Sequence, residues 1–189
     1  MEMMELPQFG AGEAMSIVLT LLAVIAATVP FVKGFRVCLQ AWQVTRRVPL
    51  EALADAGLPE EDEVEPLAHY LVRLARKAIR DTEGHPDEFV FDATEHHVMD
   101  EYDVQFATPI SMYAGILPPM GFIGTTGGLL ILFLSTRLTD TSLELGGVAL
   151  ALVSSVVALL GFGVLEGLRI RLYGRMLDGI STARRALEA

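Results

Sequence analysis

The sequence predicts an all-α membrane protein, with three transmembrane helices and long cytoplasmic helical extensions. Hydrophobic residues make up 52% of the 189-residue chain, and the mean hydropathy is +0.45, which is high for a soluble domain. Three runs without a charged residue, 14–32, 110–134 and 145–165, contain 19, 25 and 21 residues. A transmembrane helix needs roughly 20 such residues, so each run is long enough to cross a bilayer.

The first transmembrane helix and its cytoplasmic extension are predicted over 14–48. After the apolar run, VKGFRVCLQAWQVTRRV continues at helical spacing as far as Pro49, where a helix is expected to end. The preceding residues, 1–13, are expected to form a short extracytoplasmic N-terminus. They contain three glutamates and no lysine or arginine, whereas a signal peptide begins with positive charge.

Residues 49–105 are predicted to form an acidic cytoplasmic helical segment. They hold 16 acidic residues, concentrated in PEEDEVEP. Residues 66–81, PLAHYLVRLARKAIRD, are typical of an amphipathic helix. Its apolar face consists of Leu67, Leu71, Leu74, Ala75, Ala78 and Ile79. A second helix is expected over 88–105.

The remaining elements are a second transmembrane helix over 106–136, an extracytoplasmic turn over 137–144, and a third transmembrane helix with a cytoplasmic C-terminal helix over 145–189. The basic residues set their orientation. Of 14, eight lie between Lys33 and Arg80, five lie from Arg169 onward, and only Arg137 lies in the turn. The positive-inside rule therefore places the N-terminus and the turn outside, and 33–109 and the C-terminus in the cytoplasm.

Several function classes have little support in the sequence. The net charge of −10 argues against nucleic acid as a partner. The single cysteine, Cys38, excludes an internal disulfide. In Glu95-His96-His97 the two histidines point about 100° apart on a helix, which favours a solvated surface over a metal site. No nucleophile–base set is present, so neither an enzyme nor a cofactor is predicted.

The interiors of the three apolar runs contain no titratable side chain that could carry a proton. Charged residues within a membrane are costly and usually mark ion pathways. A proton-conducting assembly would therefore have to take its titrating group from another chain. Glu166, at the cytoplasmic end of the third run, is equally compatible with an interfacial position and with a role in ion exit.

Small residues recur at helical spacing in the second and third runs. The second has Gly121, Gly124, Thr125 and Gly128, and the third has Gly147, Ala151, Ser154, Ala158 and Gly161. Such stripes let helices approach closely, so ordinary helix packing is one interpretation. The pair Pro118-Pro119 favours a functional site, because it frees backbone carbonyls that protein or a water-lined cavity must satisfy. One chain is not expected to cover both stripes, which predicts association with further helices.

The motif P-x-x-G-x-x-G-T-x-x-G, formed by Pro118, Gly121, Gly124, Thr125 and Gly128, resembles the second core helix of the MotA/TolQ/ExbB ion-channel family. The predicted topology is similar to that of the TolQ and ExbB branch. In the third run, G-x-A-x-A-L-x-x-S corresponds to Gly147, Ala149, Ala151, Leu152 and Ser155. The sequence departs from the family at Leu150, where ExbB-like members carry a glutamate, and at Ala158 and Val164, which replace a common glycine and a common proline.

The resemblance implies a homopentamer in the bacterial inner (cytoplasmic) membrane that forms an ion channel driving a rotary motor. The second and third helices would enclose a dimer of a single-span partner like ExbD, TolR or MotB, whose membrane aspartate carries H⁺ or Na⁺. The candidate ion-pathway residues are Thr125, Ser155, Ser154 and Thr126. The candidate packing residues are Pro118, Gly121, Gly124, Gly128, Gly147 and Ala151. The two prolines are expected to bend the cytoplasmic end of the second helix.

Two other classes remain as alternatives. One is a membrane scaffold, in which the small-residue stripes only pack and 49–105 is a docking surface. The other is a self-sufficient channel for a small solute, which needs no aspartate from a partner.

Overall fold

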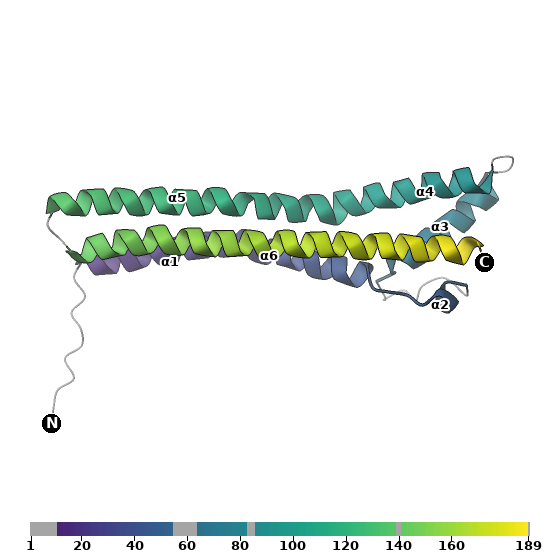
Figure 1. Cartoon of the computed structure of the whole chain (residues 1–189), viewed down its shortest axis with the longest axis horizontal. Coiled ribbons are helices and arrows are strands. Elements are labelled where there is room, and N and C mark those ends of the chain that lie inside the picture. The colour runs from purple at the N-terminus through teal and green to yellow at the C-terminus, as the bar shows by residue number, and fades with distance from the viewer. Residues whose placement is uncertain (1–10, 55–63, 83–85, 139–140, 189) are drawn as a thin grey trace, which may run out of the picture. The chain divides into compact units, whose positions relative to one another are not determined.

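The computed structural model describes residues 11–54, 64–82, 86–138 and 141–188, and within these ranges every regular element is a helix. The chain order is α1 (Ala11–Val44), α2 (Leu50–Ala54), α3 (Leu67–Asp81), α4 (Asp87–Tyr102), a π-helix (Asp103–Ala107), α5 (Thr108–Leu138) and α6 (Thr141–Glu188) (Figure 1). No strand occurs among the described residues, which confirms the predicted all-α class.

Three helical stretches are long and apolar enough to cross a membrane, as predicted. They are Ile17–Val44, Asp87–Ser135 and Leu143–Glu188. Parts of three predicted segments lie outside the described residues: 1–10 of the N-terminal segment, 139–140 of the turn, and 55–63, which includes most of PEEDEVEP.

The chain divides into two compact units. The first, here called the apolar unit, comprises Met1–Lys33 and Tyr113–Val164. The second, here called the polar unit, comprises Gly34–Met112 and Leu165–Ala189. The helices α1, α5 and α6 contribute residues to both units, whereas α2, α3, α4 and the π-helix belong to the polar unit alone.

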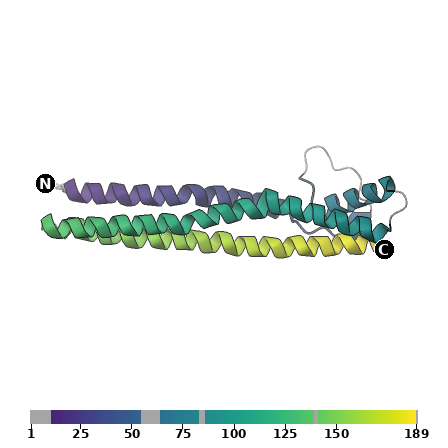
Figure 2. The same ribbon diagram turned by 90° about the horizontal axis from the view of Figure 1, so that it is seen from above.

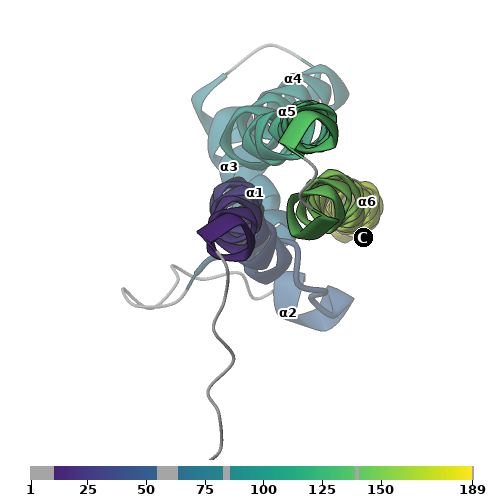
Figure 3. The ribbon, with the colours of Figure 1, turned by 90° about the vertical axis from the view of Figure 1, so that its left-hand side faces the viewer.

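In the apolar unit, parts of α1, α5 and α6 form a three-helix arrangement that is seen end-on in Figure 3. Small residues occupy the buried faces of α5 and α6. At Gly161, an added Cβ would lie 3.1 Å from Leu117 Cδ1 and 3.3 Å from Phe31 Cδ2, so side chains of α5 and α1 both fill the space beside this glycine. Large apolar residues face outward, among them Leu21, Ile25, Phe122, Ile123, Phe133 and Leu160.

The polar unit has the opposite distribution of side chains. Its core contains large apolar residues from several helices, including Leu53, Leu71, Val72, Leu172 and Met176. The amphipathic pattern that predicted a helix over 66–81 forms α3, and Leu71 and Ala75 on its apolar face are fully buried. This face packs in the core because burying its apolar side chains stabilises a helix that its length alone would leave marginal.

Two helix boundaries differ from the predictions. α1 ends at Val44, before the predicted end at Pro49, and α2 was not predicted. The helix expected over 88–105 does not end there, since every residue from Asp87 to Leu138 is helical (Figure 2). The π-helix explains this continuity. Pro109 has no N–H to donate to the carbonyl of Gln105, and the proline ring crowds that carbonyl. The wider turn of the π-helix, in which the Thr108 N–H donates to the Asp103 carbonyl, accommodates the proline ring.

Both residues of the pair Pro118-Pro119 lie inside α5, so the helix continues through them.

The lone thiol, Cys38, is only 3% exposed in the polar unit. It therefore belongs to the core and not to the accessible surface.

Candidate functional site

The small-residue stripes of α5 and α6 pack directly against each other in the apolar unit. A Cβ added to Gly121 would lie 2.7 Å from Ala158 Cβ, and one added to Gly147 would lie 2.7 Å from the Gly128 carbonyl oxygen. An added Cβ at Gly124 would overlap the Ser154 side chain. The two backbones therefore approach so closely that larger residues would not fit.

This packing corrects one expectation from the sequence. The stripes were predicted to need further helices because one chain would not cover both. Instead they cover each other within a single chain, and Gly121, Gly124, Gly128, Gly147 and Ala151 are all buried. The sequence pattern identified the packing residues, but it does not by itself require a pentamer.

Two predicted pathway residues, Thr125 of α5 and Ser155 of α6, meet at the edge of this interface. Their hydroxyl groups are in hydrogen-bonding contact. The Thr125 hydroxyl also lies 2.9 Å from the carbonyl oxygen of Gly121 and 3.3 Å from that of Ala151 on the other helix. Both side chains are half-buried. They form a short polar string that reaches from one helix to the next.

The other two predicted pathway residues lie elsewhere. Ser154 is buried against Gly124, and its hydroxyl donates to Leu150 O on its own helix at 2.7 Å. Thr126 is exposed, and its hydroxyl donates to Phe122 O within α5. In this chain Ser154 is thus a packing residue, and Thr126 is not brought together with Thr125 and Ser155. Pro118 is half-buried.

A second polar feature lies wholly within the polar unit, beside the π-helix. A cavity of about 620 Å³ is lined by residues of the π-helix, by residues of the first turn of α5, and by the part of α6 between Glu166 and Tyr173. Its polar side chains include Asp103, Ser111, Glu166, Arg169 and Tyr173. Arg169 donates to Glu166 at 2.7 Å, so the carboxylate that was considered for ion exit is paired.

The sequence reasoning did not find this cavity. One signal was present in the sequence, namely Pro109 in the middle of a helical pattern, six residues after Asp103. A proline at such a position requires a local change in helical hydrogen bonding, and π-helices are frequent at functional sites.

The histidine motif shows no sign of a metal site. His96 and His97 are exposed, and Glu95 accepts a hydrogen bond from Arg184 at 3.1 Å. Within the described residues, no group of three or more histidine, cysteine, aspartate or glutamate side chains could hold a metal ion.

Ion pairs and hydrogen bonds to carboxylates lie on the surface of the polar unit. Arg73 binds Glu65 through two bonds of 2.9 and 2.7 Å. Tyr70 donates to Glu101 at 3.1 Å. Burial raises the pKa of Tyr70, and the bond to the Glu101 carboxylate raises it further.

Neither a family model, nor a curated protein, nor a solved structure matches the chain.

Proposed function

We propose that the chain is the ion-channel subunit of a motor that is driven by the proton-motive force. In this proposal α1, α5 and α6 span the bacterial inner membrane, with the N-terminus outside and the polar unit in the cytoplasm. Five copies surround a dimer of a single-span partner, as in the family that the sequence resembles. The partner supplies the titrating aspartate that the apolar runs of this chain lack.

The observation that carries the proposal is the contact between the Thr125 and Ser155 hydroxyls. Among the described residues of the apolar unit, these hydroxyls form a polar string across two helices whose other contacts are apolar or small. Hydroxyl groups can both donate to a carboxylate and accept from a carboxylic acid. They would therefore stabilise the partner's aspartate in either protonation state as it passes.

The apolar runs contain no Asp, Glu, Lys, Arg or His, which gives a direct expectation. The chain alone, reconstituted in liposomes, should pass few protons under an imposed pH gradient. Together with a co-purified single-span partner that bears a membrane aspartate, it should pass protons at a rate that an internal pH-sensitive dye records.

Substitutions at two adjacent threonines test the role of the string. Thr125→Val keeps the shape of the side chain and removes the hydroxyl, and it should lower proton flux through the complex by roughly tenfold, the cost of one hydrogen bond to a charged group. Thr125→Ser should retain most of the flux. Thr126→Val is the matched control and should retain flux as well, because Thr126 bonds only within its own helix.

Two results would contradict this assignment. Normal flux in Thr125→Val with none in Thr126→Val would move the pathway to the neighbouring face of α5. Normal flux in both valine variants would mean that Thr125 only packs.

One observation favours the scaffold alternative. The hydroxyls of Thr125 and Ser154 already have carbonyl acceptors within the chain, and the glycine stripes are mutually covered. A scaffold would use these contacts for stability alone, and it would bind partners through the polar unit. Loss of stability in Thr125→Val without any partner-dependent flux in the wild-type chain would support that function.

A further inference from the structure

A pocket rich in arginine lies in the polar unit, away from the cavity beside the π-helix. It has a volume of about 250 Å³ and lies between the residues that follow α1 and the C-terminal part of α6. Four arginines line it, namely Arg46, Arg47, Arg175 and Arg185, together with one acidic residue, Asp178. The hydroxyls of Thr45, Ser181 and Thr182 also line the pocket, but each already donates its proton to a backbone carbonyl three or four residues earlier, so the donors for a ligand come from the arginines. This local excess of positive charge contrasts with the chain's net charge of −10.

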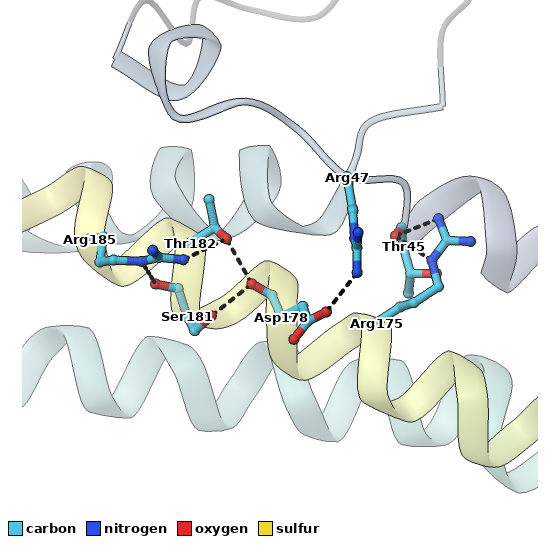
Figure 4. Close-up of polar contacts among 7 residues, drawn as sticks. All are labelled: Thr45, Arg47, Arg175, Asp178, Ser181, Thr182 and Arg185. Carbon is cyan, nitrogen blue, oxygen red and sulfur yellow. Dashed lines mark hydrogen bonds and ion pairs between the residues drawn. The ribbon is translucent and has the colours of Figure 1, made fainter.

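Arg175 is held in place on two sides, by Thr45, whose contact is drawn in Figure 4, and by the Trp42 ring. Its Nε and one terminal nitrogen donate to the Thr45 carbonyl oxygen at 3.2 and 3.0 Å. Its guanidinium carbon lies 4.0 Å from the centroid of the Trp42 ring. A guanidinium carries five N–H donors, so an arginine fixed in this way still has donors for a ligand.

The other labelled charges in Figure 4 are less firmly held. Arg47 pairs with Asp178 at 3.3 Å, with both side chains largely exposed. Arg185 donates to the Ser181 carbonyl oxygen at 3.2 Å and to the Thr182 hydroxyl at 3.4 Å, both on its own helix. Such exposed contacts contribute little free energy, so an anion can replace them.

We propose that this pocket binds a phosphoryl group carried by a small soluble ligand, such as a phosphate monoester or a diphosphate. The lining has more arginines than acidic residues, with Arg47, Arg175 and Arg185 against Asp178, and this excess of positive charge suits a multiply charged anion better than a single carboxylate. Arginine is also the side chain whose planar fork matches phosphate oxygens in pairs. Asp178 competes with the ligand for Arg47 and therefore weakens ligand binding.

A phosphoryl group could also belong to a lipid headgroup. If α6 spans the membrane as proposed above, 13 residues separate the end of its apolar run at Leu165 from Asp178. At 1.5 Å per residue this is roughly 20 Å along the helix. The headgroup layer is only about 5–8 Å thick on each side, so the pocket lies beyond it. This distance favours a soluble ligand over a lipid headgroup. Only the distance argument rests on the proposed function, because the pocket is present whether or not the chain is an ion channel.

The test is calorimetric titration of pyrophosphate into the full chain in phosphatidylcholine nanodiscs at constant ionic strength. Saturable binding is expected. Arg185→Gln and Arg47→Gln should each weaken it by roughly tenfold, the usual value of one hydrogen bond between charged groups. Asp178→Asn should strengthen it severalfold, because it removes a negative charge and releases Arg47.

The matched control is Arg80→Gln, which removes the same charge from an exposed position of α3 that does not line the pocket. It should leave binding unchanged. Equal weakening in Arg80→Gln and Arg185→Gln would overturn the site, as would weaker binding in Asp178→Asn. The absence of saturable pyrophosphate binding would overturn the proposed soluble ligand.

A second arm separates the two sources of phosphate. Short-chain phosphatidic acid is titrated into the same variants in detergent. If it binds with the same dependence on Arg185 while pyrophosphate does not bind at all, the soluble source is wrong and the site serves a lipid. Pyrophosphate binding that responds to Arg185 and Asp178 in opposite directions supports the proposal.

Discussion

The two units bury opposite kinds of side chain. In the apolar unit most buried positions of α5 and α6 are glycine, alanine or serine, with Leu117 and Leu150 as the large exceptions, while Phe122, 70% exposed, and Leu160, 65% exposed, point outward. In the polar unit many of the buried positions are large apolar residues, among them leucine, valine and methionine, and the exposed surface carries ion pairs such as Arg47–Asp178 and Arg184–Asp92.

This difference agrees with the membrane arrangement proposed above, in which the two units lie in different media. In water, stability comes from removing large apolar side chains from the solvent. In lipid that gain is absent, and helices associate through close backbone approach between small residues. The apolar unit follows the second rule and the polar unit follows the first, although both are built from the same helices α1 and α6.

The largest expected effect concerns the side of the membrane on which the polar unit lies. Cys38 is a poor reporter, because its burial should protect it from thiol reagents on either side. In a Cys38→Ala background, Lys77→Cys on the exposed surface of α3 should react with a membrane-impermeant maleimide only after the cells are permeabilised. Glu5→Cys, in the predicted outer segment, should react in intact cells. The reverse pattern would invert the proposed topology.

Truncation of a core leucine should separate the two units clearly. Leu172 is fully buried in the polar unit, and Leu172→Ala should cost about 2–5 kcal/mol of unfolding free energy through lost burial and a cavity. Leu130, 60% exposed in the apolar unit, is the counterpart, and Leu130→Ala should change stability by less than about 0.5 kcal/mol. Thermal unfolding in mild detergent measures both. A large loss at Leu130 would mean that protein, and not lipid, covers that face.

Enlarging a buried glycine should destabilise the apolar unit, whereas truncating a leucine destabilises the polar unit. Gly128→Ala would bring a Cβ to 2.6 Å from Ala151 N, a backbone atom that cannot move aside easily. The cost should be about 1–3 kcal/mol, the usual penalty for overpacking. The adjacent Gly127 has nothing within 4 Å of its added Cβ, so Gly127→Ala should be tolerated. Resistance to unfolding in a denaturing detergent compares the two, and equal behaviour would refute the close α5–α6 contact.

The smallest effect is a pH dependence in the polar unit. The pKa of Tyr70 is raised above 10.0 by burial and by the bond to Glu101; Glu65 also raises it, and Arg73 lowers it. Because the folded-state pKa exceeds that of the unfolded chain, this contribution to stability is complete below pH 10 and is lost as the pH rises through the folded-state value. Tyr70→Phe should lose about 0.5–1 kcal/mol near pH 7.

The control for this effect is the alkaline limb of the stability curve. As the pH rises above 10, the wild-type chain should lose stability more steeply than Tyr70→Phe, as measured by chemical unfolding at each pH. Parallel curves would show that Tyr70 does not titrate with folding.

The sequence by itself determined the helices that depend on local pattern. Apolar runs of 19 to 25 residues indicate helices long enough to span a bilayer, and the six apolar residues on one face of 66–81 predict α3. The glycine and alanine stripes were also visible, because residues three and four apart share a helix face.

Only the tertiary structure decided which faces meet. Periodicity shows that Gly121, Gly124 and Gly128 lie together on one side of α5, but it contains no information on which helix covers them, since that contact joins residues about 20–40 positions apart. For the same reason the sequence did not reveal that Ser154 packs while Thr125 contacts Ser155. Nor did it reveal that Cys38 is buried, or that arginines from two distant segments line one pocket. Helix formation follows from local hydrogen bonding and side-chain pattern. These pairings follow from close packing between residues far apart in the sequence, so they depend on how all the helix faces fit together.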